Sequence, residues 1–262
     1  ATTPPYRALR YGDGLFETLL FAHGGPVSLE LHLERMWNGM SILGFEFDKS
    51  TFLAEINHGL AMLTEGLGAE HKARIRISVY RGGQGAFLPE SDRPEFWIEL
   101  HALKSTPTEF LENIGVATDY PLTYSQLSAV KSMNALPYIL AARQAKKAGW
   151  NDAILLNHAD QIVECTSSNI FFVQDETIRT PTLTSACLPG TMRARTITAC
   201  KELGLPLIEK DISLTNLDTM TEVFVTNAIQ GIRKVKHIVG SAYSSENFPL
   251  SDQIRAHFPY FL

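Results

Sequence analysis

Residues 153–173 read Ala153-Ile-Leu-Leu-Asn-His-Ala-Asp-Gln-Ile-Val-Glu-Cys-Thr-Ser-Ser-Asn-Ile-Phe-Phe-Val173. Three short apolar runs, at about 153–157, 161–165 and 169–173, are separated by polar residues that favour turns. This spacing predicts three consecutive strands. Helical patterns flank them, because apolar residues recur at three- and four-residue steps on both sides. The stretch therefore predicts a sheet associated with helices, in a fold of mixed α and β class.

The patterns on either side extend this interpretation along the chain. We expect helices from about Asn134 to Ala148, closed by Gly149, and from about Thr191 to Leu203, closed by Gly204. Two further strands are predicted at Glu222–Thr226 and Ile232–Ile238. In the first hundred residues we expect strands at Leu15–Phe21, Ala73–Tyr80 and Phe96–Leu103, a hairpin turn at Gly24–Pro26, and helices at Leu29–Leu43 and about Thr51–Leu63.

The length of 262 residues suits two domains. A polar stretch from Thr118 to Gln126, around Pro121, has neither helical nor strand periodicity and is the predicted linker. We therefore expect an N-terminal α/β domain over residues 1–120 and a C-terminal α/β domain over residues 121–262.

Composition excludes several classes of protein. Hydrophobic residues make up 45% and charged residues 19%, which is typical of a globular chain and excludes a disordered one. The net charge of −5, without a cluster of Lys and Arg, argues against binding to nucleic acid or an anionic membrane. No apolar run approaches the ~20 residues that span a bilayer.

Cysteine and histidine usage argues against disulfides and metal sites. The three cysteines lack C-x-x-C spacing, which predicts a cytoplasmic protein without a disulfide framework. The eight histidines never group with ligand spacing, so we expect no bound metal. His32 is interpreted as a packed helix residue, and Cys165 has no paired histidine that would make it a nucleophile.

Four separated segments carry the chemistry: Tyr11-Gly-Asp-Gly-Leu-Phe-Glu-Thr18, Lys131-Ser-Met-Asn134, Glu164-Cys-Thr-Ser-Ser-Asn-Ile-Phe171 and Leu188-Pro-Gly-Thr-Met-Arg193. In this order they resemble the class IV aminotransferase family, the fold type IV enzymes of pyridoxal 5'-phosphate (PLP). The resemblance covers about Tyr11 to Ile238. It implies two α/β domains with the cofactor between them, a small-molecule amino substrate, and a homodimer.

Lys131 matches the lysine that forms the Schiff base in this family. Such a lysine must also move a proton at the substrate Cα, so its amine has to lose a proton easily. The apolar neighbours Ala129, Val130 and Met133 fit burial and a lowered pKa. An exposed lysine before a helix is the structural alternative.

Glu164, 33 positions after Lys131, matches the acidic partner of the pyridine nitrogen, which must hold its proton if the ring is to accept electrons. Both residues fall in the expected C-terminal domain. A solvated glutamate at the end of a strand is the alternative.

Positive charge and backbone N–H donors are needed for the cofactor phosphate. The resemblance implies that Arg35 is the phosphate-binding arginine, and that the start of the helix at Gly190, Thr191 and Met192 and the turn at Thr226 and Asn227 complete the site. It also implies a cofactor contact for Asn169. Helix caps and turns without a ligand remain the alternative for each.

Substrate contacts are expected from Phe16, Glu17, Arg81 and Ala228, with Arg81 equally interpretable as a turn residue. Lys131 with Asn134, Arg81-Gly82 and Asn227-Ala228 resemble 4-amino-4-deoxychorismate lyases, which release pyruvate and 4-aminobenzoate for folate synthesis. Glu17 instead resembles aminotransferases. Leu136 stands where branched-chain aminotransferases carry a tyrosine, and the Arg-x-His pair of D-amino acid enzymes is absent from Gly83–Phe87. We expect the lyase, with a branched-chain-like or other aminotransferase as the first alternative and a non-catalytic PLP-binding protein as the second.

Overall fold

A computed structural model describes residues 6–103 and 108–261. The described chain divides into two compact units, residues 6–103 with 130–134, and residues 108–129 with 135–261. The expected domains were 1–120 and 121–262, so the structure divides the chain earlier and returns the segment with Lys131 to the first unit. The reason is backbone pairing between segments distant in the chain, because Ser132 forms a β-bridge with Leu15 of the first unit.

The first unit contains one antiparallel sheet with strand order β2-β1-β3-β4. Its elements are α1 (Tyr6–Tyr11), β1 (Gly14–Ala22), β2 (Gly25–Pro26), α2 (Leu29–Ile42), α3 (Lys49–Thr64), β3 (Ala73–Arg81) and β4 (Pro94–Ala102). The helices and strands predicted for this region are confirmed, including the hairpin, and only α1 was not predicted.

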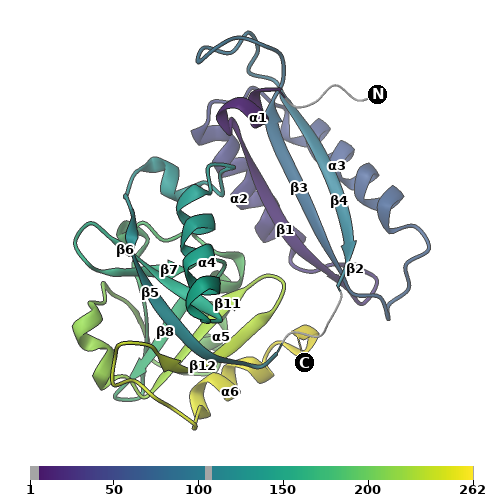
Figure 1. The fold of residues 1–262 in the computed structure, drawn as a ribbon. Coiled ribbons are helices and arrows are strands. Elements are labelled where there is room, and N and C mark those ends of the chain that lie inside the picture. Colours follow the sequence, from purple (N-terminus) through teal and green to yellow (C-terminus); the bar gives the residue numbers. More distant parts are fainter. Residues whose placement is uncertain (1–5, 104–107, 262) are drawn as a thin grey trace. The chain divides into compact units, whose positions relative to one another are not determined.

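Alternation in β3 explains how this sheet is covered. Ile75, Ile77 and Val79 are fully buried and belong to the core that includes residues of α2 and α3, whereas Arg74 on the other face is exposed. Both helices lie on one face of the sheet (Figure 1). The segment around Lys131 pairs along the edge of β1, and Val130 belongs to the same core as the helices.

The second unit contains an eight-stranded mixed sheet with strand order β10-β9-β8-β11-β12-β5-β6-β7. The strands are β5 (Phe110–Leu122), β6 (Asp152–Asn157), β7 (Ile162–Cys165), β8 (Asn169–Gln174), β9 (Thr177–Thr180), β10 (Leu207–Glu209), β11 (Glu222–Asn227) and β12 (Gly231–Ile238). The helices are α4 (Leu136–Ala148), α5 (Thr191–Glu202) and α6 (Pro249–Ala256), with 3₁₀ turns η1 (Gln126–Ala129), η2 (Leu183–Ser185), η3 (Leu214–Thr219) and η4 (Pro259–Phe261).

The predicted linker at 118–126 is wrong over its first half, because β5 runs to Leu122. This strand is central in the sheet and pairs in parallel with both β12 and β6. Its partners lie tens of residues further along the chain, and its burial does not alternate regularly. The local pattern therefore gave no strand signal, and β9, β10 and α6 were also not predicted.

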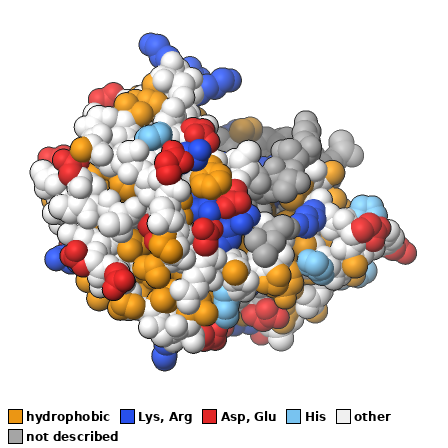
Figure 2. Space-filling view, turned by 90° about the horizontal axis from the view of Figure 1, so that it is seen from below, with side chains coloured by type: hydrophobic (Ala, Val, Ile, Leu, Met, Phe, Trp, Pro, Cys, Tyr) orange, Lys and Arg blue, Asp and Glu red, His pale blue; other side chains and the backbone are white. Residues whose placement is uncertain are grey.

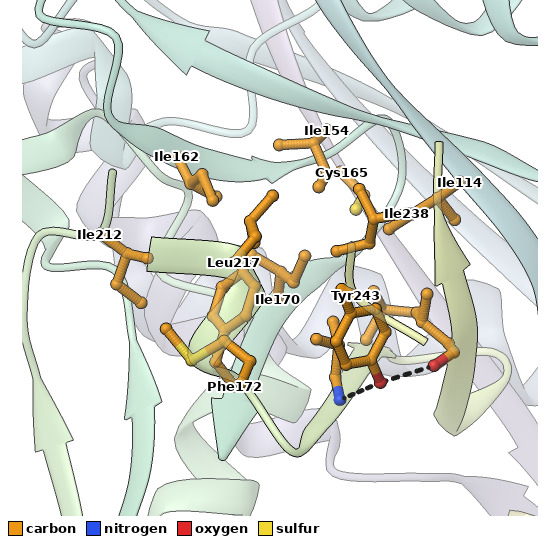
Figure 3. Packing of buried hydrophobic residues seen from close by; sticks show 14 of the residues in the cluster. Ile114, Ile154, Ile162, Cys165, Ile170, Phe172, Ile212, Leu217, Ile238 and Tyr243 are labelled. Atoms are coloured by element: carbon orange, nitrogen blue, oxygen red, sulfur yellow. Dashed lines mark hydrogen bonds between the residues drawn. The ribbon is translucent and has the colours of Figure 1, made fainter. Parts of the chain in front are cut away.

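One face of this sheet is covered by an apolar core (Figure 3). Ile114, Ile154, Ile170 and Phe172 come from three strands, β5, β6 and β8, and are all buried. Tyr243 is the one member with a polar end, and its hydroxyl donates to Val235 O at 2.9 Å and accepts from Val223 N at 2.8 Å. The phenol thus joins β11 to β12 from within the core.

Acidic and basic side chains are mixed on the face seen in Figure 2, with apolar side chains between them. This fits the small net charge of −5. Within residues 6–103 and 108–261, no helix combines the length and apolarity needed to cross a membrane.

Candidate functional site

In the first unit, Lys131 is held against the end of β1. Phe16 N donates to Lys131 O at 2.9 Å, and Met133 N donates to Gly14 O at 3.0 Å. The Lys131 side chain is half-buried, and its Nζ lies 4.8 Å from the centroid of the Phe16 ring. The expected lysine and the expected Phe16 are therefore neighbours, since backbone pairing fixes one beside the other.

Arg76 shares the same ring and was missed from the sequence. Its guanidinium lies 3.7 Å from the Phe16 centroid, and its Nε donates to Ser78 Oγ at 3.2 Å. Burial lowers the pKa of Arg76, although Glu99 opposes this. The available signal was a basic residue in the middle of a strand whose alternate residues are apolar. A guanidinium on the aromatic ring that Lys131 also contacts can bind a carboxylate.

Glu17 forms a buried ionic cluster with His32 and Arg35. Its side chain is 1% exposed, and Arg35 binds it through two hydrogen bonds, from Nε to Oε1 at 2.8 Å and from Nη2 to Oε2 at 2.6 Å. His32 Nδ1 lies 2.6 Å from Oε2. Both residues come from α2, one turn apart, which places them on the same face of the helix.

Opposing effects set the charges in this cluster. Burial alone would raise the pKa of Glu17, but attraction to Arg35 and hydrogen bonds from His32 and Arg35 outweigh it and lower that pKa to about 2. Burial lowers the pKa of His32 below its usual value. At neutral pH the carboxylate is therefore ionised and the imidazole neutral, with Nδ1 carrying the proton that it donates.

Direct substrate contact by Glu17 does not fit this arrangement. Both carboxylate oxygens are bonded within the first unit, and the side chain is buried beneath Arg35 and His32. Glu17 instead positions Arg35, the expected phosphate ligand. The sequence could not distinguish these roles, because the bidentate pairing joins β1 to α2.

Arg81 is engaged in the fold of the first unit. Its guanidinium donates to Asp13 Oδ2 at 3.2 Å, to the carbonyl oxygens of Leu43 and Gly44, and to Asp92. The side chain is buried. These contacts support its interpretation as a turn residue rather than as a substrate ligand.

The neighbouring loop is held by an arginine that the sequence did not single out. Arg7 is buried and donates to Asp13 through Nε at 2.8 Å, and to the carbonyl oxygens of Gly85 at 3.0 Å and Ala86 at 2.7 Å. The loop after β3 is therefore anchored to α1.

In the second unit, Glu164 is buried, with 4% of its side chain exposed. Its Oε1 accepts from Tyr138 Oη at 2.7 Å. Its Oε2 accepts from Asn169 Nδ2 at 3.1 Å and from Leu188 N at 3.2 Å. A carboxylate that accepts several hydrogen bonds is stabilised in its ionised form.

Cys165 is next to Glu164 in the chain but belongs to the apolar core (Figure 3). Burial, with the nearby Asp152 and Glu164, raises the pKa of its thiol well above the usual value. A thiol in this state is a poor nucleophile. The expectation that Cys165 has no nucleophilic role therefore agrees with its position.

Asn169 connects Glu164 to the beginning of α5. Its Nδ2 also donates to Leu188 O at 2.9 Å, and it faces Thr226 across the β8–β11 ladder. A Cβ on Gly190 would lie 1.9 Å from Asn169 Oδ1, so any larger residue would have to displace the Asn169 side chain. The expected residues Glu164, Asn169, Gly190 and Thr226 are thus brought together.

The hydroxyl of Thr226 is buried and marks a candidate ligand position. The residue is 1% exposed, and within the described residues its Oγ1 has no hydrogen-bond partner. Gly190 is the N-cap of α5 and Thr191 and Met192 form its first turn, where backbone amides and the helix dipole favour an anion. A buried unpaired hydroxyl near a helix N-terminus fits a phosphate group.

Asn227 shapes the turn that follows β11. Its Oδ1 accepts from Ile229 N at 3.0 Å and Gln230 N at 2.8 Å, and its Nδ2 donates to Ser168 Oγ at 3.1 Å. Ala228, expected to contact substrate, lies half-buried in this turn. Asn227 therefore orders the turn by its side chain, so a ligand here would meet the backbone amides that it orients.

Comparison with known proteins gives a consistent result. The profile of the amino-transferase class IV family matches residues 14–238, most of the chain. The chain belongs to the class IV aminotransferase family. The family, the enzyme class and the cofactor that the sequence led us to expect are confirmed at the level of the family, whose members are PLP-dependent enzymes.

Relatives within the class IV family differ in activity. A probable branched-chain-amino-acid aminotransferase of Rickettsia felis is 27% identical over 88% of this chain and 79% of its own. An aminodeoxychorismate lyase of Vibrio harveyi is 25% identical over 95% of this chain and 91% of its own. The branched-chain aminotransferase structure from Thermoproteus uzoniensis has a TM-score of 0.87 at 23% identity, covering 98% of this chain and 88% of that one, which confirms the fold.

Proposed function

We propose that this protein is a PLP-dependent 4-amino-4-deoxychorismate lyase that releases pyruvate and 4-aminobenzoate for folate synthesis. The observation that carries the cofactor assignment is the cluster in the second unit. There a buried glutamate, a helix N-terminus and a buried threonine hydroxyl that has no partner among the described residues come together. These groups match, in chemistry, a pyridine nitrogen and a phosphate.

Each expected residue receives a role in this proposal. Glu164, ordered by Asn169, would hold the protonated pyridine nitrogen, while Thr226 and the amides of Gly190–Met192 would hold the phosphate. Arg35, fixed by Glu17, would add positive charge to the phosphate, and the amides of the turn after Asn227 would add donors.

Lys131 would bind the cofactor aldehyde and then act as the proton carrier. When bound, the cofactor withdraws electrons from the substrate carbon that loses a proton. The Lys131 amine would accept that proton and return one to the departing three-carbon unit. Phe16 would support the lysine, and Arg76, on the same ring, would bind a substrate carboxylate.

Support for the lyase over other members comes from Lys131 with Asn134, from Leu136, and from the Vibrio harveyi relative. An aminotransferase is the second candidate, and the paired Glu17 together with the Rickettsia felis relative favours it. We also propose a homodimer, from the family resemblance, and a cytoplasmic location, which the three buried free cysteines support.

The deciding experiment measures pyruvate released from 4-amino-4-deoxychorismate by the PLP-loaded protein, coupled to lactate dehydrogenase, without any 2-oxo acid. Release that is lost in Lys131→Ala supports the lyase. No release from protein that retains the absorption band of lysine-bound cofactor rejects it, and amino transfer to 2-oxo acids is then tested. Turnover that is unchanged in Lys131→Ala would reject Lys131 as the catalytic residue.

A further inference from the structure

Tyr138 is a partly buried tyrosine outside the motifs of the sequence and without a role in the proposed function. It lies in the first turns of α4, and its ring packs against the apolar cluster formed by α4, β5 and β6. Its hydroxyl donates to Glu164 Oε1 at 2.7 Å. The contact joins α4, which begins at Leu136, to the strand β7, so no local pattern in the sequence predicts it.

Each of the two carboxylate oxygens of Glu164 accepts hydrogen bonds from different donors. Asn169 and Leu188 N reach Oε2, and Tyr138 reaches Oε1. Because burial and the adjacent Glu164 raise the pKa of Tyr138, the phenol stays protonated and remains a donor at any working pH. Glu164 is held by Tyr138 from one side and by Asn169 from the other.

We propose that Tyr138 is a positioning residue that fixes the Glu164 carboxylate and lowers its basicity, keeping it ionised for the protonated pyridine nitrogen of the cofactor. This inference rests on the proposed function. Its physical basis is that a hydrogen bond donated to a carboxylate favours the charged form. If Tyr138 served only to pack the core, its ring would be sufficient, whereas the proposed role requires its hydroxyl.

The test uses Tyr138→Phe, which keeps the ring and removes only the hydroxyl. Apoprotein is titrated with pyridoxamine 5'-phosphate, which forms no bond to Lys131, and the Kd is measured from pH 4 to 8. In a plot of affinity against pH, binding weakens at acid pH as Glu164 takes up a proton, and this part of the curve is its acid limb. Loss of a hydrogen bond to a charged group is expected to move this acid limb up by about one pH unit, a roughly tenfold weaker Kd at a pH on the limb.

Two controls separate the hydroxyl from packing. Tyr120→Phe changes a phenol that packs against the same cluster, with no hydrogen bond to Glu164 within the described residues, and should leave the limb in place. In a Glu164→Gln background only the pH dependence of the cofactor phosphate should remain, and Tyr138→Phe should then have no effect on it. Thermal unfolding of each variant verifies that the protein is folded.

The outcomes distinguish the two proposals. An acid limb that is identical in wild type and Tyr138→Phe, with normal binding by both, overturns the role of Tyr138 and leaves the proposed function in place. A limb that moves equally in the Glu164→Gln background also overturns it. Absence of binding by the wild-type apoprotein overturns the proposed function itself.

Discussion

Replacing Glu17 by Gln tests the buried cluster of the first unit. Glu17 is 1% exposed, and its pKa is lowered from 4.5 to about 2 in the folded protein. A shift of about 2.5 units corresponds to about 3 kcal/mol of stability at neutral pH. Glu17→Gln removes this charge and leaves Arg35 without its counter-ion, so we expect the free energy of unfolding at pH 7 to fall by about 3 kcal/mol.

The stability contribution of Glu17 should decrease as the pH falls. Because the folded-state pKa is the lower one, the contribution of Glu17 is complete above about pH 4.5 and is lost as the pH falls toward 2. The deficit of Glu17→Gln relative to wild type should therefore shrink to about 2 kcal/mol at pH 3.5.

Urea unfolding of the apoprotein at pH 7, 5 and 3.5 measures both effects. Glu34→Gln, on an exposed neighbour of Arg35 in α2, is the matched control and should change stability by less than about 0.5 kcal/mol. A deficit below about 1 kcal/mol at pH 7, or one that stays constant from pH 7 to 3.5, would refute the reasoning.

Three further substitutions test single contacts. Gly190→Ala places a Cβ 1.9 Å from Asn169 Oδ1, so we expect PLP affinity to fall at least about tenfold in equilibrium titration; unchanged affinity would contradict the close approach. Thr226→Val removes a buried hydroxyl that is unpaired among described residues, so thermal stability should hold or rise while PLP binding weakens; equal binding would separate Thr226 from the phosphate. Tyr243→Phe leaves Val223 N unsatisfied and should cost about 1–3 kcal/mol in urea unfolding without altering turnover.

The expected site residues illustrate how far a motif can be interpreted. Lys131 beside Phe16, and Glu164 with Asn169, occupy positions consistent with their expected roles. Phe16, Glu164 and Asn169 lie in strands that the local patterns predict, and Lys131 pairs with the beginning of one of them. Glu17 and Arg81 occupy interior positions with charged partners instead. A sequence motif gives residue types and spacing, but it does not reveal which charged side chains satisfy one another.

From the sequence alone, periodicity determined most helices and strands, and four spaced motifs determined the family. These signals are local, since they depend on side chains a few residues apart or on short segments kept in order. Tertiary structure decided the central place of β5, the return of Lys131 to the first unit, and the partners of Glu17, Arg76 and Tyr138. Each depends on contacts between segments distant in the chain, where burial and charge pairing, rather than local propensity, determine the lowest free energy.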